Sequence, residues 1–94
     1  MRKYAWYGAF VPRDFSDGPL DVADSWRHSN GHTNGLGLHL ERFARSAGPL
    51  PDGFVDAMLT LLSTGELFPR IALSRGELLL DVRPAPPALS LIHI

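Results

Sequence analysis

The side chains best suited to chemistry in this sequence lie on one predicted helix, over residues 36–47. His39, Arg42 and Ser46 are spaced three and four apart, so a helix places an imidazole, a guanidinium and a hydroxyl in one row. A guanidinium is always charged and presents a planar fork of donors that fits phosphate or carboxylate. The row could therefore hold an anion. The alternative is an ordinary solvated arginine without a ligand.

The opposite face of this helix is apolar and must be buried. Its residues recur at helical spacing and are Leu36, Leu40, Phe43, Ala44 and Ala47. Gly48 and Pro49 end the helix. A second helix is expected to start at an N-cap, Asp52, and to end before Gly65. Its apolar face comprises Phe54, Val55, Met58, Leu59 and Leu62.

Strands are predicted on both sides of the helices. Residues 4–11 should form two short pieces that bend at Gly8, and residues 20–28 alternate as a strand. A tight turn at Asn30-Gly31 would lead into a return strand over 32–34. Residues 68–74 and 78–82 form a further hairpin. This order predicts an α+β two-layer sandwich, with an antiparallel sheet of about four to five strands and two helices on one face.

The chain divides into two unequal parts. Residues 1–83 are expected to form one domain, which is the size that a chain of 94 residues allows. Residues 84–94 are Pro-rich and then apolar, and a domain rarely ends on an uncharged apolar strand. We interpret 84–94 as the result of truncation or as foreign sequence.

Composition argues against several function classes. The formal net charge is −1 and there is no Lys/Arg run, so a sequence-independent grip on nucleic acid is not expected. There is no membrane-length apolar run and no cysteine, which predicts a cytoplasmic protein without disulfides. No metal site is expected either, because the Asn-Gly turn makes convergence of His28, His32 and His39 improbable.

Asp24 interrupts the apolar side of its strand between Val22 and Trp26. A charge there either meets a polar partner or faces a cleft. The alternative is that this segment is an edge strand.

Three segments together resemble a known family. They are Asp24-Ser25-Trp26-Arg27 before the Asn-Gly turn, the helix from His39 to Ala47, and Pro69-Arg70-Ile71-Ala72-Leu73-Ser74-Arg75-Gly76. Over residues 20–83 the chain resembles the amino-terminal domain of class IV aminotransferases. These are the fold type IV pyridoxal phosphate enzymes, which include branched-chain and D-amino acid aminotransferases and aminodeoxychorismate lyase.

The resemblance implies a role for five residues. Arg42 would bind the phosphate of pyridoxal phosphate, with His39 as its neighbour in the cofactor site. Asp24, Trp26 and Arg27 would line the substrate pocket. An intact enzyme of this family is a homodimer that acts on an amino acid or an aminodeoxychorismate-like amine.

One requirement of that chemistry is not met locally. A pyridoxal phosphate enzyme needs a lysine that bonds to the cofactor, and the only lysine here is Lys3, before the first predicted strand. In the family this lysine belongs to a second domain, so the chain alone is expected to be inactive, with no catalytic residue of its own. The alternative is a stand-alone α+β module that binds an anion or a protein without catalysis.

Overall fold

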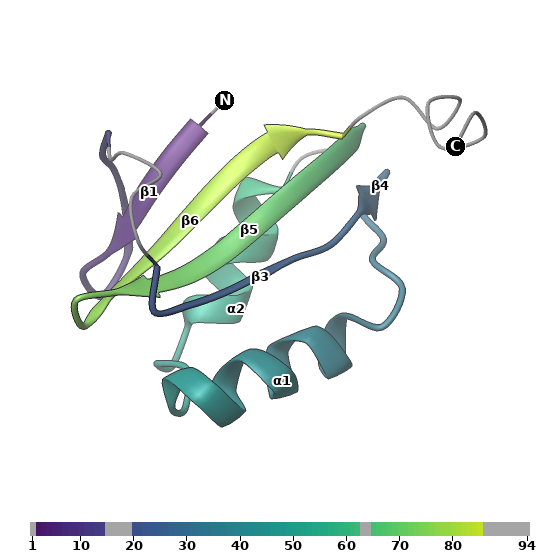
Figure 1. The fold of residues 1–94 in the computed structure, drawn as a ribbon. Coiled ribbons are helices and arrows are strands. Elements are labelled where there is room, and N and C mark those ends of the chain that lie inside the picture. Colours follow the sequence, from purple (N-terminus) through teal and green to yellow (C-terminus); the bar gives the residue numbers. More distant parts are fainter. Residues whose placement is uncertain (1, 15–19, 63–64, 86–94) are drawn as a thin grey trace.

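The computed structural model describes residues 2–14, 20–62 and 65–85, and these form an antiparallel sheet with two helices on one face (Figure 1). The α+β prediction is confirmed. The strands are β1 (Arg2–Trp6), β2 (Phe10–Pro12), β3 (Val22–Ser25), β4 (His28–Ser29), β5 (Glu66–Ser74) and β6 (Glu77–Pro84). The helices are α1 (Leu36–Ala47) and α2 (Phe54–Leu61). The sheet has six strands rather than four to five, because the short β4 pairs separately with β5.

The strand order is β2-β1-β6-β5-β3, so the two long strands β5 and β6 occupy the middle of the sheet. They join through a two-residue turn in which Arg75 and Gly76 both have positive φ, 52° and 78°. Such a turn matches the twist of a hairpin and fixes its register, with Ile71 opposite Leu80 and Arg70 opposite Asp81. The predicted bend at Gly8 is also confirmed, because β1 and β2 pair on either side of it.

Three details of the sequence prediction are wrong. The strand over 20–28 is divided into β3 and β4, and residues 32–34 contribute one bridge from His32 to Ser29 rather than a strand. Asp52 does not cap α2, because the N-cap is Gly53 in the left-handed conformation, without a side-chain hydrogen bond. The helix α2 ends at Leu61, before Gly65 as predicted. The backbone carbonyl of Leu61 accepts a hydrogen bond from Arg2 Nη2 at 3.1 Å.

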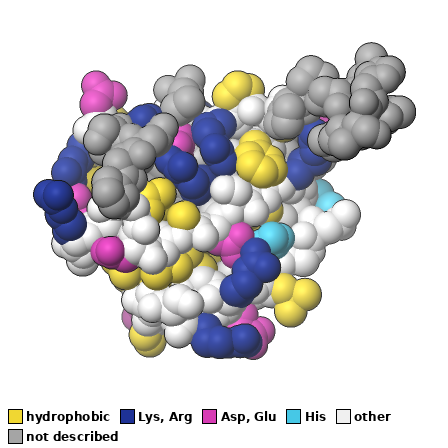
Figure 2. Space-filling view, viewed as in Figure 1, with side chains coloured by type: hydrophobic (Ala, Val, Ile, Leu, Met, Phe, Trp, Pro, Cys, Tyr) yellow, Lys and Arg dark blue, Asp and Glu magenta, His cyan; other side chains and the backbone are white. Residues whose placement is uncertain are grey.

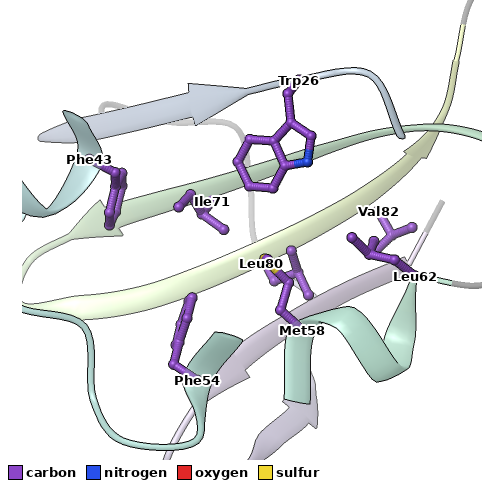
Figure 3. Close-up of a cluster of buried hydrophobic side chains, with 8 residues drawn as sticks. All are labelled: Trp26, Phe43, Phe54, Met58, Leu62, Ile71, Leu80 and Val82. Atoms are coloured by element: carbon purple, nitrogen blue, oxygen red, sulfur yellow. The ribbon is translucent and has the colours of Figure 1, made fainter. Parts of the chain in front are cut away.

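The main core lies between the helices and the sheet (Figure 3). Phe43 points into it from α1 and Phe54 and Met58 from α2, against Ile71 and Leu80 of the central strands. These five side chains are fully buried, whereas the predicted core residue Leu59 is 39% exposed. Each buried Phe or Leu of this kind stabilises a fold by about 1.5–3 kcal/mol. The core therefore fixes α1 below β3, where the polar residues of interest lie.

Of the predicted tail, residues 86–94 lie outside the described residues. Within the described residues, the helices have 12 and 8 residues, so neither has the length of about 20 that a membrane crossing requires.

Candidate functional site

The polar residues of α1 and β3 meet at the edge of the sheet. Asp24 of β3 faces α1, and Arg42 grips its carboxylate with a fork: Nε donates to Oδ2 at 3.1 Å, and Nη2 lies 2.7 Å from Oδ1. His39, one turn earlier on α1, brings Nδ1 to 3.4 Å from Asp24 Oδ1. Figure 2 shows acidic, basic and histidine side chains touching one another between β3 and α1. Asp24 thus meets a polar partner, as one alternative predicted, and β3 is an edge strand of the sheet, as another predicted.

The two partners in this pair differ sharply in exposure. The Asp24 side chain is 8% exposed, whereas that of Arg42 is 66% exposed. The recorded hydrogen bonds of Arg42 use Nε and Nη2, which leaves Nη1 without a partner among the described residues. The arginine is therefore held from one side and can donate to a ligand from the other.

Electrostatics favours the charged form of both groups. Burial raises the pKa of Asp24, but the hydrogen bonds and charges of Arg42 and His39 outweigh it, and the net pKa lies below the ordinary value. The hydrogen bond to Asp24 in turn raises the pKa of Arg42. Asp24 is thus an anion at neutral pH, and it fixes the direction in which the Arg42 guanidinium points.

An open hollow of about 210 Å³ lies beside this pair. Its lining consists of Trp26, Arg27, Ser29, His32, Asn34 and His39. His39 belongs to both the hollow and the Asp24–Arg42 pair, because its Nδ1 lies 3.2 Å from Arg42 Nη2. The lining contains no carboxylate and includes one arginine and two histidines, which suits an anionic ligand. The volume is below the roughly 300–1,000 Å³ typical of drug-sized ligands, so it suits a small one.

The structure places the five predicted site residues near one another but in different settings. Asp24, His39 and Arg42 form one contact network. Trp26 is 3% exposed, so it forms the floor of the hollow, with its ring 5.6 Å from that of His39. Arg27 also lines the hollow, and its Nη1 lies 3.7 Å from Glu66 Oε1.

Ser46 does not join the predicted row as a ligand group. It is exposed, and no recorded side-chain hydrogen bond in the described part of the chain links it to Arg42. Its neighbour Arg45 pairs with Glu41 at 3.0 Å, as expected for an exposed pair one turn apart. The polar contacts of α1 with β3 thus lie in its first two turns, around His39 and Arg42.

The sequence did not predict that His32 and Asn34 line the hollow. It also did not predict a second charged pair. His32 Nε2 lies 3.0 Å from Asn34 Oδ1, in the loop that follows β4. The second pair joins Arg70 and Asp81 at 3.0 Å across the central hairpin. The two-residue turn could have revealed that pair, because it places residues 70 and 81 opposite each other.

His28, His32 and His39 do not come together as a metal site. His28 is 2% exposed, and its Nδ1 contacts Thr33 Oγ1 at 2.6 Å rather than another histidine. Burial, and then the charge of His32, lower the pKa of His28. In residues 2–14, 20–62 and 65–85, no group of three or more His, Cys, Asp or Glu side chains could hold a metal ion.

Lys3 is remote from this site. It lies on β1, and β1 is separated from β3 by β6 and β5 in the sheet. Three strand spacings of about 4.8 Å correspond to roughly 14 Å, which is more than a lysine side chain spans. The strand registers also place Lys3 on the sheet face of Asp81, whereas Asp24 is on the opposite face with Ile71. Comparison with protein-family models and with curated proteins found no match to this chain.

Proposed function

We propose that this chain is the first domain of a class IV aminotransferase-like enzyme, and that Arg42 binds the phosphate of pyridoxal phosphate. The observation that carries the proposal is the Asp24–Arg42 fork beside the hollow. It provides a cation that is fixed in direction, exposed on its free side and next to a small concavity. His39, whose Nδ1 lies 3.2 Å from Arg42 Nη2 and which also lines the hollow, would contact the same phosphate.

The described residues fit this cofactor in part. Arg42 and His39 supply the donors that a phosphate requires, and the hollow supplies room and an aromatic floor at Trp26. Bound pyridoxal phosphate would supply an electron sink for chemistry at the α-carbon of an amino acid. The lysine that this chemistry requires would come from a part of the enzyme outside these 94 residues.

The contacts of each predicted site residue suggest its role in the proposed enzyme. Asp24 orients Arg42, because it holds the Nε side of the guanidinium and leaves Nη1 for the ligand. Arg27, at the rim of the hollow, would face the substrate. That substrate would be an amino acid or an aminodeoxychorismate-like amine, and the intact enzyme would act as a homodimer.

A second candidate function rests on the position of Lys3. A chain whose only lysine lies three strands away from the anion site could bind a phosphate or carboxylate without catalysis. The two functions differ in one measurable respect. An enzyme domain should recognise the pyridine ring as well as the phosphate, whereas an anion-binding module should recognise the phosphate alone.

The test is a titration of the 94-residue chain with pyridoxamine 5′-phosphate, pyridoxamine and inorganic phosphate, followed by NMR. The amine form of the cofactor avoids an imine with Lys3 or the N-terminus. We expect pyridoxamine 5′-phosphate to bind at least tenfold more tightly than either other compound, since a hydrogen bond to a charged group contributes about 1.5–3 kcal/mol.

Two matched variants locate the binding. Arg42→Ala should lose the preference for the phosphorylated form, whereas Arg45→Ala, which removes an arginine one turn along the same helix, should keep it. Equal affinity for pyridoxamine 5′-phosphate and inorganic phosphate would favour the anion-binding module. Equal affinity for the phosphorylated and unphosphorylated vitamers would contradict both functions.

A further inference from the structure

His39 Nδ1 has two neighbours with opposite requirements. Asp24 Oδ1, at 3.4 Å, can only accept a hydrogen bond, and Arg42 Nη2, at 3.2 Å, can only donate one. A ring nitrogen either carries a proton or offers a lone pair, so Nδ1 can satisfy one neighbour at a time. Whether Nδ1 carries a proton therefore decides which contact forms, and of the two ring forms with that proton only the doubly protonated one adds a positive charge.

The two states differ in what they offer to a ligand. In the neutral ring with a lone pair on Nδ1, this atom accepts an N–H of Arg42 and keeps it away from other acceptors. In the doubly protonated ring, Nδ1 donates to Asp24 and the Arg42 N–H is released. The formal charge of the three side chains is zero in the first state and +1 in the second. A doubly charged anion gains from both changes.

We propose that His39 takes up one proton when the Arg42 site binds a dianion, which makes dianionic phosphoesters the preferred ligand class. This inference rests on the proposed function for the identity of the natural ligand, but not for the proton uptake. The proton comes from solvent, stays on the ring while the anion is bound, and returns to solvent when the anion leaves. A singly charged carboxylate would gain less from the same protonation.

Charged and aromatic side chains surround His39 on several sides. Asp24 on β3 favours the charged ring, whereas Arg42 on α1 opposes it, as do Arg27 and His32, which line the same hollow. The Trp26 ring, 5.6 Å away, stabilises a neighbouring cation through its π face. Since Asp24 has a lowered pKa, it remains an anion throughout the range in which a histidine titrates. A bound dianion then adds the charge that favours the protonated ring.

The test follows the titration of His39 by NMR with and without saturating sulfate. Sulfate remains a dianion from pH 5 to 8, whereas a phosphoester itself titrates near pH 6 and would confuse the proton count. We expect sulfate to raise the midpoint of His39 by about one pH unit, the shift that a tenfold preference for the charged ring produces. Sulfate affinity should then fall by about tenfold in total as pH rises from below the midpoint of the free protein to above that of the complex, and level off beyond it, because the total change equals the shift of one linked proton.

Two variants and one second probe make the outcome decisive. His39→Gln should remove the pH dependence of sulfate affinity, whereas His32→Gln, which changes the other histidine of the hollow, should preserve it. An unmoved His39 midpoint in sulfate and in pyridoxamine 5′-phosphate, together with tight binding of the latter through Arg42, would overturn this inference and leave the proposed function standing. A raised midpoint in sulfate without selective binding of pyridoxamine 5′-phosphate would support this inference and reject the proposed function.

Discussion

Two aspartate–arginine pairs lie in different parts of this fold and differ in burial. Arg70 and Asp81 pair at 3.0 Å on the face of the sheet away from the helices, with side chains 17% and 3% exposed. Arg42 and Asp24 pair at the edge beside α1, where the arginine is 66% exposed. Arg70 is enclosed by the protein, whereas Arg42 is hydrogen-bonded to Asp24 at one end of its guanidinium and exposed to solvent at the other. The same two residue types therefore suit a structural role in one place and a binding role in the other.

The largest expected effect is a loss of stability when the Arg70–Asp81 pair is broken. Asp81→Ala leaves the Arg70 guanidinium enclosed without this partner, and removal of one member of a buried pair costs about 3–5 kcal/mol. Urea unfolding at pH 7 should show this loss of free energy of unfolding. The double variant Arg70→Met, Asp81→Leu should recover part of it, since no buried charge is left. A single-variant loss below about 1 kcal/mol would show that the enclosed pair is not structural.

Arg42→Ala should have an intermediate effect that depends on pH. The substitution leaves the Asp24 carboxylate, 8% exposed, without its fork, and unpaired buried charges are costly. In the native protein the pKa of Asp24 is lowered, so its contribution is fully present above the unfolded-state value near pH 4. The contribution is lost as pH falls through the folded-state value. The difference in stability between native protein and variant should thus be large at pH 7 and should shrink as pH falls below the unfolded-state value near pH 4. A difference that grows toward low pH would have the wrong sign.

Asp24→Ala should cost less than Arg42→Ala. The residue left behind is an exposed guanidinium that water can solvate, so the loss should be about 1 kcal/mol or less. Its main effect should be on binding, because Arg42 loses the contacts that orient it. Urea unfolding of the two variants measures their free energies of unfolding, and titration with pyridoxamine 5′-phosphate measures their affinities for the ligand. A larger loss of stability for Asp24→Ala than for Arg42→Ala would reverse the assignment of the buried partner.

Arg45→Ala should have the smallest effect. Its pair with Glu41 is exposed on both sides, at 73% and 65%, and pairs one turn apart contribute about 0.2–0.5 kcal/mol. Thermal unfolding should show almost no change, and ligand affinity should remain that of the native protein. A strong loss of binding in Arg45→Ala would mean that the general positive charge of α1, rather than the Asp24–Arg42 fork, attracts the anion.

The sequence predicts the layers of this fold because its apolar spacing is regular. The apolar stripe of α1 around Phe43 can be buried on only one side of the helix. The alternating apolar residues around Ile71 and Leu80 can likewise be buried on only one face of the sheet. The boundaries are harder to predict, because backbone pairing decides them. The strand expected over 20–28 is divided after Ser25: Trp26 keeps one backbone hydrogen bond to Pro69 of β5, and ladder pairing with β5 resumes at His28. The N-cap of α2 moves from Asp52 to Gly53 because the backbone there is left-handed.

The candidate site could be predicted only one residue at a time. The spacing of His39 and Arg42 indicates a shared helical face, and Asp24 stands out as a charge among apolar strand positions. No local pattern indicates that these residues meet, because the contact depends on how α1 packs below β3. The hollow formed with His32 and Asn34 depends on the path of the loop after β4, which sequence periodicity does not determine.

The most direct test of the account follows the arginine Nε–H signals of the 94-residue chain while pyridoxamine 5′-phosphate is added. Arg42 Nε donates to Asp24, so its signal reports directly on that pair, whereas Arg70 donates to Asp81 through Nη2 and its Nε–H signal serves as the control from the enclosed pair. The account predicts that the Arg42 signal shifts with saturation while the Arg70 signal stays in place. A shift of Arg70 alone, or no arginine shift at ligand concentrations that saturate the protein by another probe, would contradict it.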